Sequence, residues 1–218
     1  MAIFHQHKCI FIHSPRTGGT TIHNALGGGP KDHFPWNKFK FDPKYNYNEF
    51  WDSYLKFATV RNPFDWLVSL YNHPSGGPSY RSQCGCPKSK DPVNIAPSEP
   101  LGKRSFEDYA RCPTLFHNES PYINQSRTIG PDIDLIIKFE NLQEGFDELC
   151  ERIGRPKSTL NVVGPTANRD KDYKKHYDDK LVQDVSRIFR EDLNRFKYSF
   201  SNESLWYKLA AKYNYYDE

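Results

Sequence analysis

Apolar residues gather in three short runs, and a segment with helical character follows each run. The runs cover residues 10–12, 55–60 and 135–139. Their continuity predicts strands that are buried on both faces of a sheet. Strands that alternate with helices predict an α/β fold, in which a central parallel sheet is flanked by helices.

Helix signals fill much of the remaining chain. Asn62 is a good N-cap residue and Pro63 fits the first position of the helix that follows. The predicted helices cover residues 20–26, 48–54, 63–71, 105–111, 142–153, 178–196 and 203–213. No clear period is found at residues 31–38, 72–104 and 118–130. The second of these segments is a long loop rich in Pro, Gly and Ser, and such loops are usually functional.

The segment after the first apolar run combines a glycine turn with a helix start. Gly18 and Gly19 let the backbone turn sharply and come close to a ligand. Thr20 and Thr21 then open a helix whose unpaired N–H groups face the same point as Arg16. This arrangement predicts binding of an anion, most often a phosphate. The pattern of the nucleoside triphosphatase loop, G-x-x-x-x-G-K-[ST], is not met, because no Lys follows the second glycine.

A second anion site is predicted where the second apolar run ends. Arg61 directly follows that run, at the strand end where ligands bind in open parallel sheets. Ser69 lies in the following helix, away from its apolar stripe. A guanidinium and a hydroxyl placed in this way can bind a phosphate by charge-assisted and neutral hydrogen bonds.

Together these motifs resemble those of sulfotransferases that use 3′-phosphoadenosine 5′-phosphosulfate (PAPS), in particular the carbohydrate sulfotransferase branch. Ser14-Pro-Arg-Thr-Gly-Gly-Thr-Thr21 resembles the loop that holds the 5′-phosphosulfate, with Arg16 where that loop usually has Lys. Arg61 and Ser69 match the residues that contact the 3′-phosphate. Trp66 is a departure, since many relatives carry Arg there. Weaker matches lie at residues 51–63, 136–142 and 173–200.

The resemblance implies a P-loop-like sulfotransferase fold in a single domain of residues 1–218, with an acceptor-binding insertion at about residues 72–130. It implies transfer of a sulfuryl group from PAPS to a hydroxyl or amine of a carbohydrate-like acceptor. The product of the donor is then 3′,5′-adenosine bisphosphate (PAP), and no metal ion is expected. The donor-binding residues that the resemblance implies are Arg16, Thr17, Gly18, Gly19, Thr20, Thr21, Arg61, Ser69, Arg169 and Lys171.

Two residues are candidates for catalysis. Arg16 would stabilise the charge on the leaving 5′-phosphate, and its role would be purely electrostatic because a guanidinium cannot give up its proton. His33 is the candidate general base, with His73 as another histidine that could meet an acceptor. For His13 and His23 a structural role is favoured. Glu140 is expected to bond loop N–H groups at the tip of the third strand.

Composition and charge argue against several classes of protein, among them nucleic-acid-binding and membrane-spanning proteins. The 218 residues carry a net charge of +3, which argues against nucleic acid as the main partner. No apolar run approaches the ~20 residues of a membrane span, and no secretory signal precedes the first strand, so a cytoplasmic protein is expected. Cys84 and Cys86 lack the spacing of a structural zinc site, and Cys9 and Cys150 are expected to be core thiols.

Two other functions remain open at this point. A nucleotide or small-molecule kinase could use a related phosphate loop, although the sequence lacks both the Gly-Lys-[Ser/Thr] element and an Asp suited to bind Mg²⁺ after an apolar strand. A non-catalytic module could bind a nucleotide or a glycan without transferring sulfate. Arg16 and Trp66 are the two features that favour the non-catalytic alternative.

Overall fold

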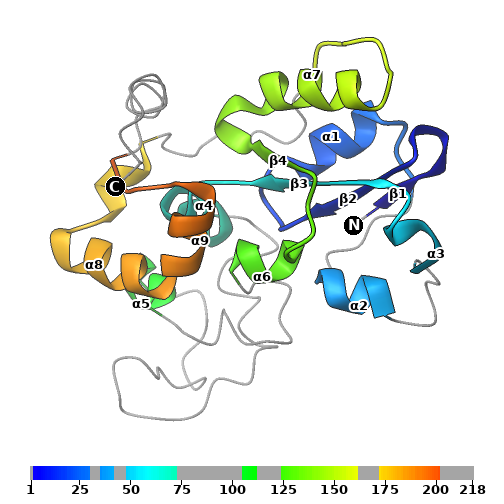
Figure 1. The fold of residues 1–218 in the computed structure, drawn as a ribbon. Coiled ribbons are helices and arrows are strands. Elements are labelled where there is room, and N and C mark those ends of the chain that lie inside the picture. The colour runs from blue at the N-terminus through cyan, green and yellow to red at the C-terminus, as the bar shows by residue number, and fades with distance from the viewer. Residues whose placement is uncertain are drawn as a thin grey trace, which may run out of the picture.

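The computed structural model of the protein describes residues 2–29, 35–41, 48–72, 105–111, 124–161 and 172–201. At its centre lies a four-stranded sheet with the strand order β1-β2-β3-β4 (Figure 1). The strands are β1 (Ala2–Phe4), β2 (Cys9–His13), β3 (Leu55–Val60) and β4 (Leu135–Lys138). The three predicted strands are confirmed, and β1 is an additional one.

The sheet is mixed: the predicted parallel strands form its central part, and β1 adds an antiparallel strand at one edge. β2 pairs with β3 and β3 with β4 in parallel, whereas β1 pairs with β2 antiparallel. The reason is the length of the connection between β1 and β2, a 3₁₀ turn (η1, His5–His7) followed by Lys8 at a φ of 47°. So short a connection can join only antiparallel strands, because a parallel pair needs a long crossover.

Helices cover both faces of the sheet (Figure 1). α1 and α7 lie on one face, and α2 and α6 lie on the other. The helices are α1 (Gly19–Ala25), α2 (Trp36–Phe41), α3 (Asn48–Trp51), α4 (Pro63–Tyr71), α5 (Phe106–Ala110), α6 (Gln125–Ile129), α7 (Leu142–Arg152), α8 (Asp179–Ile188) and α9 (Arg190–Phe196). Two further 3₁₀ turns are η5 (Phe139–Asn141) and η6 (Tyr173–His176).

Side chains of the central strands alternate between two apolar cores, as the pleat of a strand requires. Phe11 and Phe57 stack with ring centroids 4.6 Å apart and pack with α1 and α7. Ile10 and Ile12 point to the other face, where Ile129 of α6 joins them. Cys9 and Cys150 are buried free thiols of the first core, as predicted, and burial raises the pKa of Cys9 to about 12.

A third core forms beside the sheet, between α4, α5 and α8. Every α4 residue from Pro63 to Leu70 is buried, including the polar Asp65 and Ser69. The predicted amphipathic α4 is therefore enclosed on all sides. The polar side chains of a helix enclosed in this way need partners inside the protein.

Some predicted helices differ from those observed. The expected helix over residues 178–196 is two helices, because the chain leaves the helical conformation at Phe189, with φ −99° and ψ 20°. The ring of Phe189 packs edge-on against Trp66 at 6.0 Å between centroids. α2 and α6 begin in segments where no period was recognised. The expected helix at 203–213, and nearly all of the predicted loop at 72–104, lie outside the described residues.

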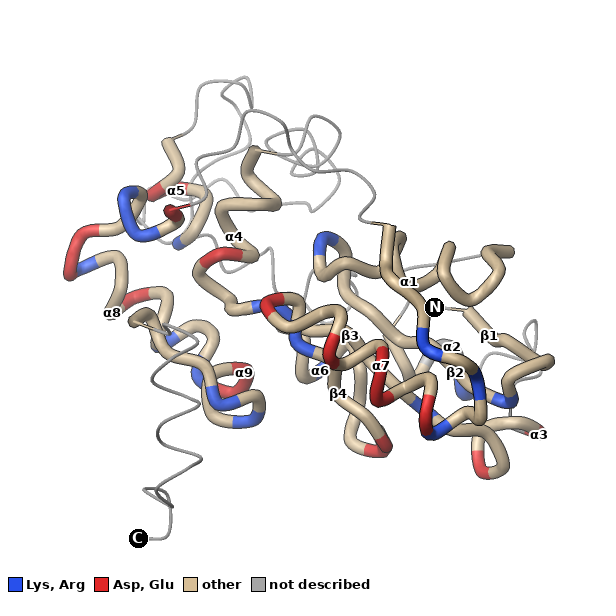
Figure 2. Tube along the Cα trace, turned by 90° about the horizontal axis from the view of Figure 1, so that it is seen from above, with Lys and Arg blue, Asp and Glu red and all other residues tan. Residues whose placement is uncertain are grey.

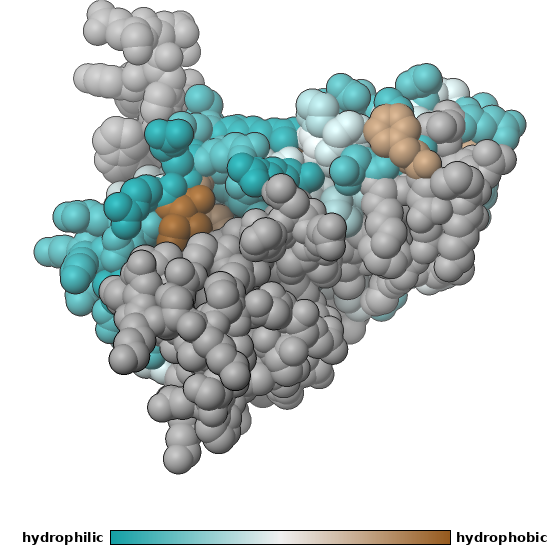
Figure 3. Space-filling view, turned by 90° about the horizontal axis from the view of Figure 1, so that it is seen from below, coloured by the Kyte–Doolittle hydropathy of each residue, from teal (hydrophilic) through white to brown (hydrophobic). Residues whose placement is uncertain are grey.

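Charged residues of both signs are interspersed along the described chain (Figure 2). The face seen from below in Figure 3 is mainly hydrophilic where it is described, with small apolar areas. Phe41 is the large hydrophobic residue that is most exposed among the described ones, at 61%. In the described ranges, none of the helices has both the length and the apolar character that a membrane crossing requires.

Candidate functional site

The loop after β2 is fixed by hydrogen bonds from three directions. The Thr17 hydroxyl donates to the carbonyl of Ser14 at 2.7 Å and lies 2.8 Å from the hydroxyl of Thr59 on β3. The indole N–H of Trp66 donates to the carbonyl of Pro15 at 2.7 Å. Trp66 thus supports the predicted phosphate loop from α4. Nothing in the sequence indicated this role, because Trp66 stood out there only as a departure from the Arg that many relatives carry. The side chain of Thr17 faces inward, so only its backbone can face a ligand.

Arg16 reaches from this loop to α4. Its φ of 65° lies in the left-handed region, which is uncommon for a residue other than glycine. Its Nε donates to the Ser69 hydroxyl at 3.4 Å, and its carbonyl accepts from Nη1 of Arg61 at 3.0 Å. Residues from the two predicted phosphate motifs therefore meet directly, although 45 and 53 positions separate them along the chain.

Arg61 is only 4% exposed and its guanidinium is held on several sides. Nε and Nη2 both lie 2.6 Å from one carboxylate oxygen of Asp65, one helical turn along α4. The guanidinium also lies 4.1 Å from the centre of the Phe139 ring. With the bond to the Arg16 carbonyl, these contacts engage three of its five N–H groups, and the other two have no partner among the residues that the structure describes.

Both arginines keep their charge despite their surroundings. Burial lowers the pKa of Arg61 to about 10, while the negative charge of Glu140 acts in the opposite direction. Burial also lowers the pKa of Arg16, and the like charge of Arg61 lowers it further. The carboxylate of Asp65 contacts Arg61, and Glu140 also acts on it, so these two carboxylates offset part of the positive charge of the two guanidinium groups. What suits this edge of the sheet to an anion is the presence of two guanidinium groups that can form charge-assisted hydrogen bonds.

The two glycines of the loop serve different purposes. Gly18 has a φ of +85°, a conformation that L side chains rarely adopt. Gly19 begins α1, and a Cβ at this position would overlap the imidazole of His13. His13 is buried and stacks on Phe11 with ring centroids 4.6 Å apart. The structural role favoured for His13 thus has a physical basis, since its ring occupies the space that Gly19 leaves open.

Replacing Gly19 with alanine is expected to destabilise the protein by about 1–3 kcal/mol, the usual cost of overpacking a core. The cost should come from the overlap with His13 and can be measured by urea unfolding. The double variant Gly19→Ala/His13→Ala removes the obstacle. Alanine at position 19 should therefore cost much less in the His13→Ala background. An equal cost in both backgrounds would show that His13 does not require the glycine.

Gln125 of α6 holds the main chain of Arg61. The Gln125 side-chain carbonyl accepts from the N–H of Arg61 at 2.8 Å, and its amide N–H donates to the Arg61 carbonyl at 2.8 Å. Gln125 and Ser126 in turn donate their own backbone N–H groups to the two carboxylate oxygens of Asp192, each at 2.8 Å. Sequence reasoning missed Gln125 and Asp192, because no local pattern marks a contact over more than 60 positions.

Glu140 at the tip of β4 also supports the site. Its carboxylate accepts from the backbone N–H of Asn62 at 2.8 Å and from the hydroxyl of Tyr198 at 2.7 Å. The preferred interpretation, that Glu140 bonds a loop N–H group, is confirmed. The Asn62 side chain caps α4 by accepting from the N–H of Phe64 and donates to the Ser199 carbonyl at 3.0 Å. The C-terminal segment is thereby joined to the start of α4.

The predicted site residues that the structure describes lie beyond the carboxyl ends of β2 and β3, in the loop after β2, at the start of α1, and in or just before α4. Thr20 is exposed and Thr21 buried at the start of α1. These residues are Arg16, Thr17, Gly18, Gly19, Thr20, Thr21, Arg61 and Ser69. His33, His73, Arg169 and Lys171 lie outside the described residues. His23 is buried in α1 with its ring 5.6 Å from that of Phe4, in agreement with a structural role.

Comparison with protein families gives a match that covers almost the whole chain. The model of the family described as "Sulfotransferase family" matches residues 1–199. Comparison with curated proteins gives no match, and neither does comparison with solved structures. The matched segment contains both predicted phosphate motifs, α6 with its contacts to Arg61, and Ser199, whose carbonyl accepts from the Asn62 side chain.

Proposed function

Because the chain belongs to the sulfotransferase family, we propose that it transfers a sulfuryl group from PAPS to a hydroxyl or amine of a carbohydrate-like acceptor. The observation that carries this proposal is the contact of Arg16 with both Ser69 and Arg61 at the carboxyl edge of the sheet. A ligand with two separate phosphate groups suits such a site, in which two arginines and a helix start converge.

The donor would be held at both of its phosphates. The turn from Thr17 to Gly19 and the hydroxyls of Thr20 and Thr21 would bind the 5′-phosphosulfate. Arg61, with its two remaining N–H groups, would bind the 3′-phosphate together with Ser69. Arg169 and Lys171 are proposed to contact the adenine end. No metal ion takes part in this proposal.

The reaction needs positioning and charge stabilisation, as phosphoryl transfer does. PAPS supplies the sulfuryl group: the bond between its sulfur and the bridging oxygen breaks while the acceptor oxygen or nitrogen bonds to sulfur. Arg16 would stabilise the negative charge that develops on the 5′-phosphate of PAP. His33 is proposed to take the proton from the acceptor. Tight support of the loop by Trp66 and Thr17 would keep Arg16 in place during this step.

A transfer assay tests the proposal. The full chain is incubated with PAPS labelled with ³⁵S and a panel of polysaccharides and oligosaccharides that differ in sugar and charge. The expected result is label in at least one glycan, together with an equal amount of PAP. If PAP binds but no label is transferred to any acceptor, the non-catalytic module is the better description. If PAPS and PAP do not bind at all, the proposal is wrong.

A further inference from the structure

Arg61 lies at a point where its main chain has no strand partner. The last paired residues of β3 and β4 are Val60 and Lys138, and Arg61 follows immediately. Its N–H and carbonyl are nevertheless both satisfied, because the side chain of Gln125 bonds to each at 2.8 Å. Gln125 is fully buried. Its primary amide therefore takes the place of a neighbouring strand for this one residue.

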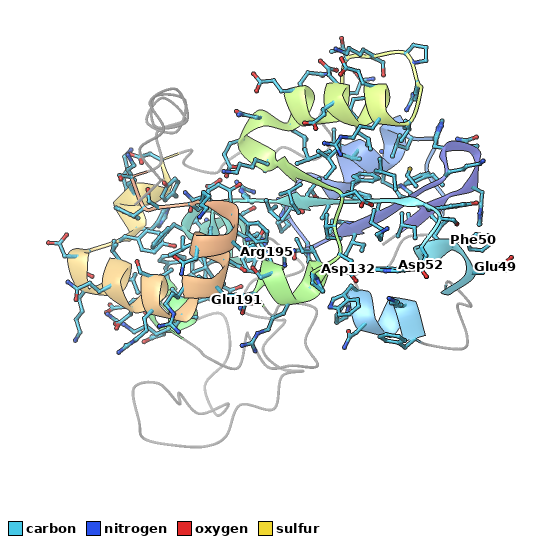
Figure 4. All side chains as sticks on the ribbon, viewed as in Figure 1. Glu49, Phe50, Asp52, Asp132, Glu191 and Arg195 are labelled. Atoms are coloured by element: carbon cyan, nitrogen blue, oxygen red, sulfur yellow. The ribbon has the colours of Figure 1, made fainter. Side chains whose placement is uncertain are left out.

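The position of Gln125 is fixed by contacts between α9 and the start of α6. Asp192 is fully buried, and its two carboxylate oxygens accept the first two N–H groups of α6. Burial raises the pKa of Asp192 to about 6, against the effect of the two hydrogen bonds. Arg195, labelled between α9 and α6 in Figure 4, donates from Nη1 to the Ser126 carbonyl at 3.0 Å. These contacts leave α6 little freedom to shift along or away from β3.

We infer that Gln125 is a positioning residue for the donor site, which sets the affinity for the 3′-phosphate through the main chain of Arg61. The inference rests on the proposed function. The guanidinium of Arg61 must hold Asp65 and the Arg16 carbonyl and still present two N–H groups to a phosphate. Charge-assisted hydrogen bonds of this kind depend strongly on distance and angle. A shift of the Arg61 backbone therefore weakens the 3′-phosphate contact first. The 5′ loop loses at most its bond from Arg61 and keeps its separate supports from Thr59 and Trp66.

The test compares two ligands that differ only in the 3′-phosphate. Calorimetry measures the affinity of the full chain for PAP and for adenosine 5′-monophosphate. The variant Gln125→Met keeps the side-chain volume but removes both hydrogen bonds to Arg61. We expect the affinity of this variant for PAP to fall by about tenfold or more, while its affinity for the monophosphate stays nearly unchanged. The variant would then have lost most of its preference for PAP. If the role of Gln125 were entirely structural, the variant would lose affinity for both ligands to the same extent.

Asn124→Ala is the matched control. Asn124 caps the same helix and donates to Glu191 of α9 at 3.0 Å, but it does not contact Arg61. This variant should lose stability through the missing cap and keep the preference for PAP. If Gln125→Met does not fold, Gln125→Glu is used in its place. Its carboxylate keeps the acceptor for the Arg61 N–H, but it loses the donor to the Arg61 carbonyl and places a negative charge beside it. Its preference for PAP should lie below that of the wild type.

The outcomes separate the two proposals. If the wild type prefers PAP and Gln125→Met, or Gln125→Glu in its place, shows the same preference, only the role of Gln125 is overturned. An equal loss of affinity for PAP and for the monophosphate in the variant also overturns this role. A wild-type chain that does not prefer PAP over the monophosphate overturns the proposed donor, and the inference with it.

Discussion

Replacing Arg61 with alanine is expected to weaken PAP binding by about 100-fold or more. The variant removes the guanidinium proposed for the 3′-phosphate, and charge-assisted hydrogen bonds are each worth about 1.5–3 kcal/mol. It also removes one partner of Asp65 and the donor to the Arg16 carbonyl, so the loop and α4 lose a direct link. Breaking a buried ion pair from one side costs about 3–5 kcal/mol. Both effects can be measured, by calorimetry and by urea unfolding.

Stability and binding must be separated for this variant. Arg61→Ala/Asp65→Ala removes both charges and should recover part of the lost stability without recovering PAP binding. Arg111→Ala is a matched control, because Arg111 also bonds to a carboxylate, Asp184 at 2.8 Å, between α5 and α8. That variant should bind PAP like the wild type. Unchanged PAP affinity in Arg61→Ala would remove Arg61 from the donor site.

Replacing Arg16 with alanine is expected to lower turnover about 10²–10³-fold, the usual effect of removing a group that stabilises developing charge. Arg16→Lys should retain much more activity. A lysine can also give a proton to the bridging oxygen, which arginine cannot. Single-turnover measurements with labelled PAPS separate this loss in the chemical step from any loss in donor binding.

The pH profile distinguishes the two side chains. Arg16 lies beside the charge of Arg61 and is partly buried, and both effects lower its pKa. The same surroundings would lower the pKa of a lysine there from a smaller starting value. The Arg16→Lys variant should therefore lose activity at a lower pH than the wild type does. Arg152→Lys, at an exposed ion pair with Glu148, should leave the profile unchanged. Full turnover in Arg16→Ala would assign charge stabilisation to the backbone N–H groups alone.

Local signals in the sequence were sufficient for the elements that carry the two phosphate motifs. Asn62 was predicted to cap α4, and its side chain does accept from the N–H of Phe64. The apolar runs predicted β2, β3 and β4, because continuous burial leaves a mark on every residue of a strand. Gly154 was predicted to end the helix over 142–153, and it takes a left-handed φ of 67° just after Ile153, the C-cap residue of α7.

Elements that depend on distant partners could not be read in this way. β1 spans three residues, too few for a period to show, and exists because it can pair with β2. α6 is five residues long, and its start is held by Asp192. The break between α8 and α9 falls at Phe189, where neither Gly nor Pro marks it and where the ring packs on Trp66.

In the candidate site, too, local sequence signals marked some residues, while others depend on distant contacts. The types of residue needed to bind phosphates were recognisable, since Arg16, Arg61 and Ser69 stand in motifs with local geometry. The residues that hold them were not, because Trp66 and Gln125 act through contacts to the main chain of distant segments. A main-chain contact needs only a donor or an acceptor at the right place. It therefore imposes no pattern on the neighbouring sequence.

The most direct test of a two-phosphate donor site is the thermal stability of the wild-type chain with PAP and, separately, with ATP and Mg²⁺. Binding to the folded state raises the melting temperature in proportion to the logarithm of the ligand concentration over its dissociation constant. A sulfotransferase donor site predicts a clear rise with PAP and little or none with ATP and Mg²⁺. Stabilisation by ATP and Mg²⁺ alone would contradict it and favour the kinase.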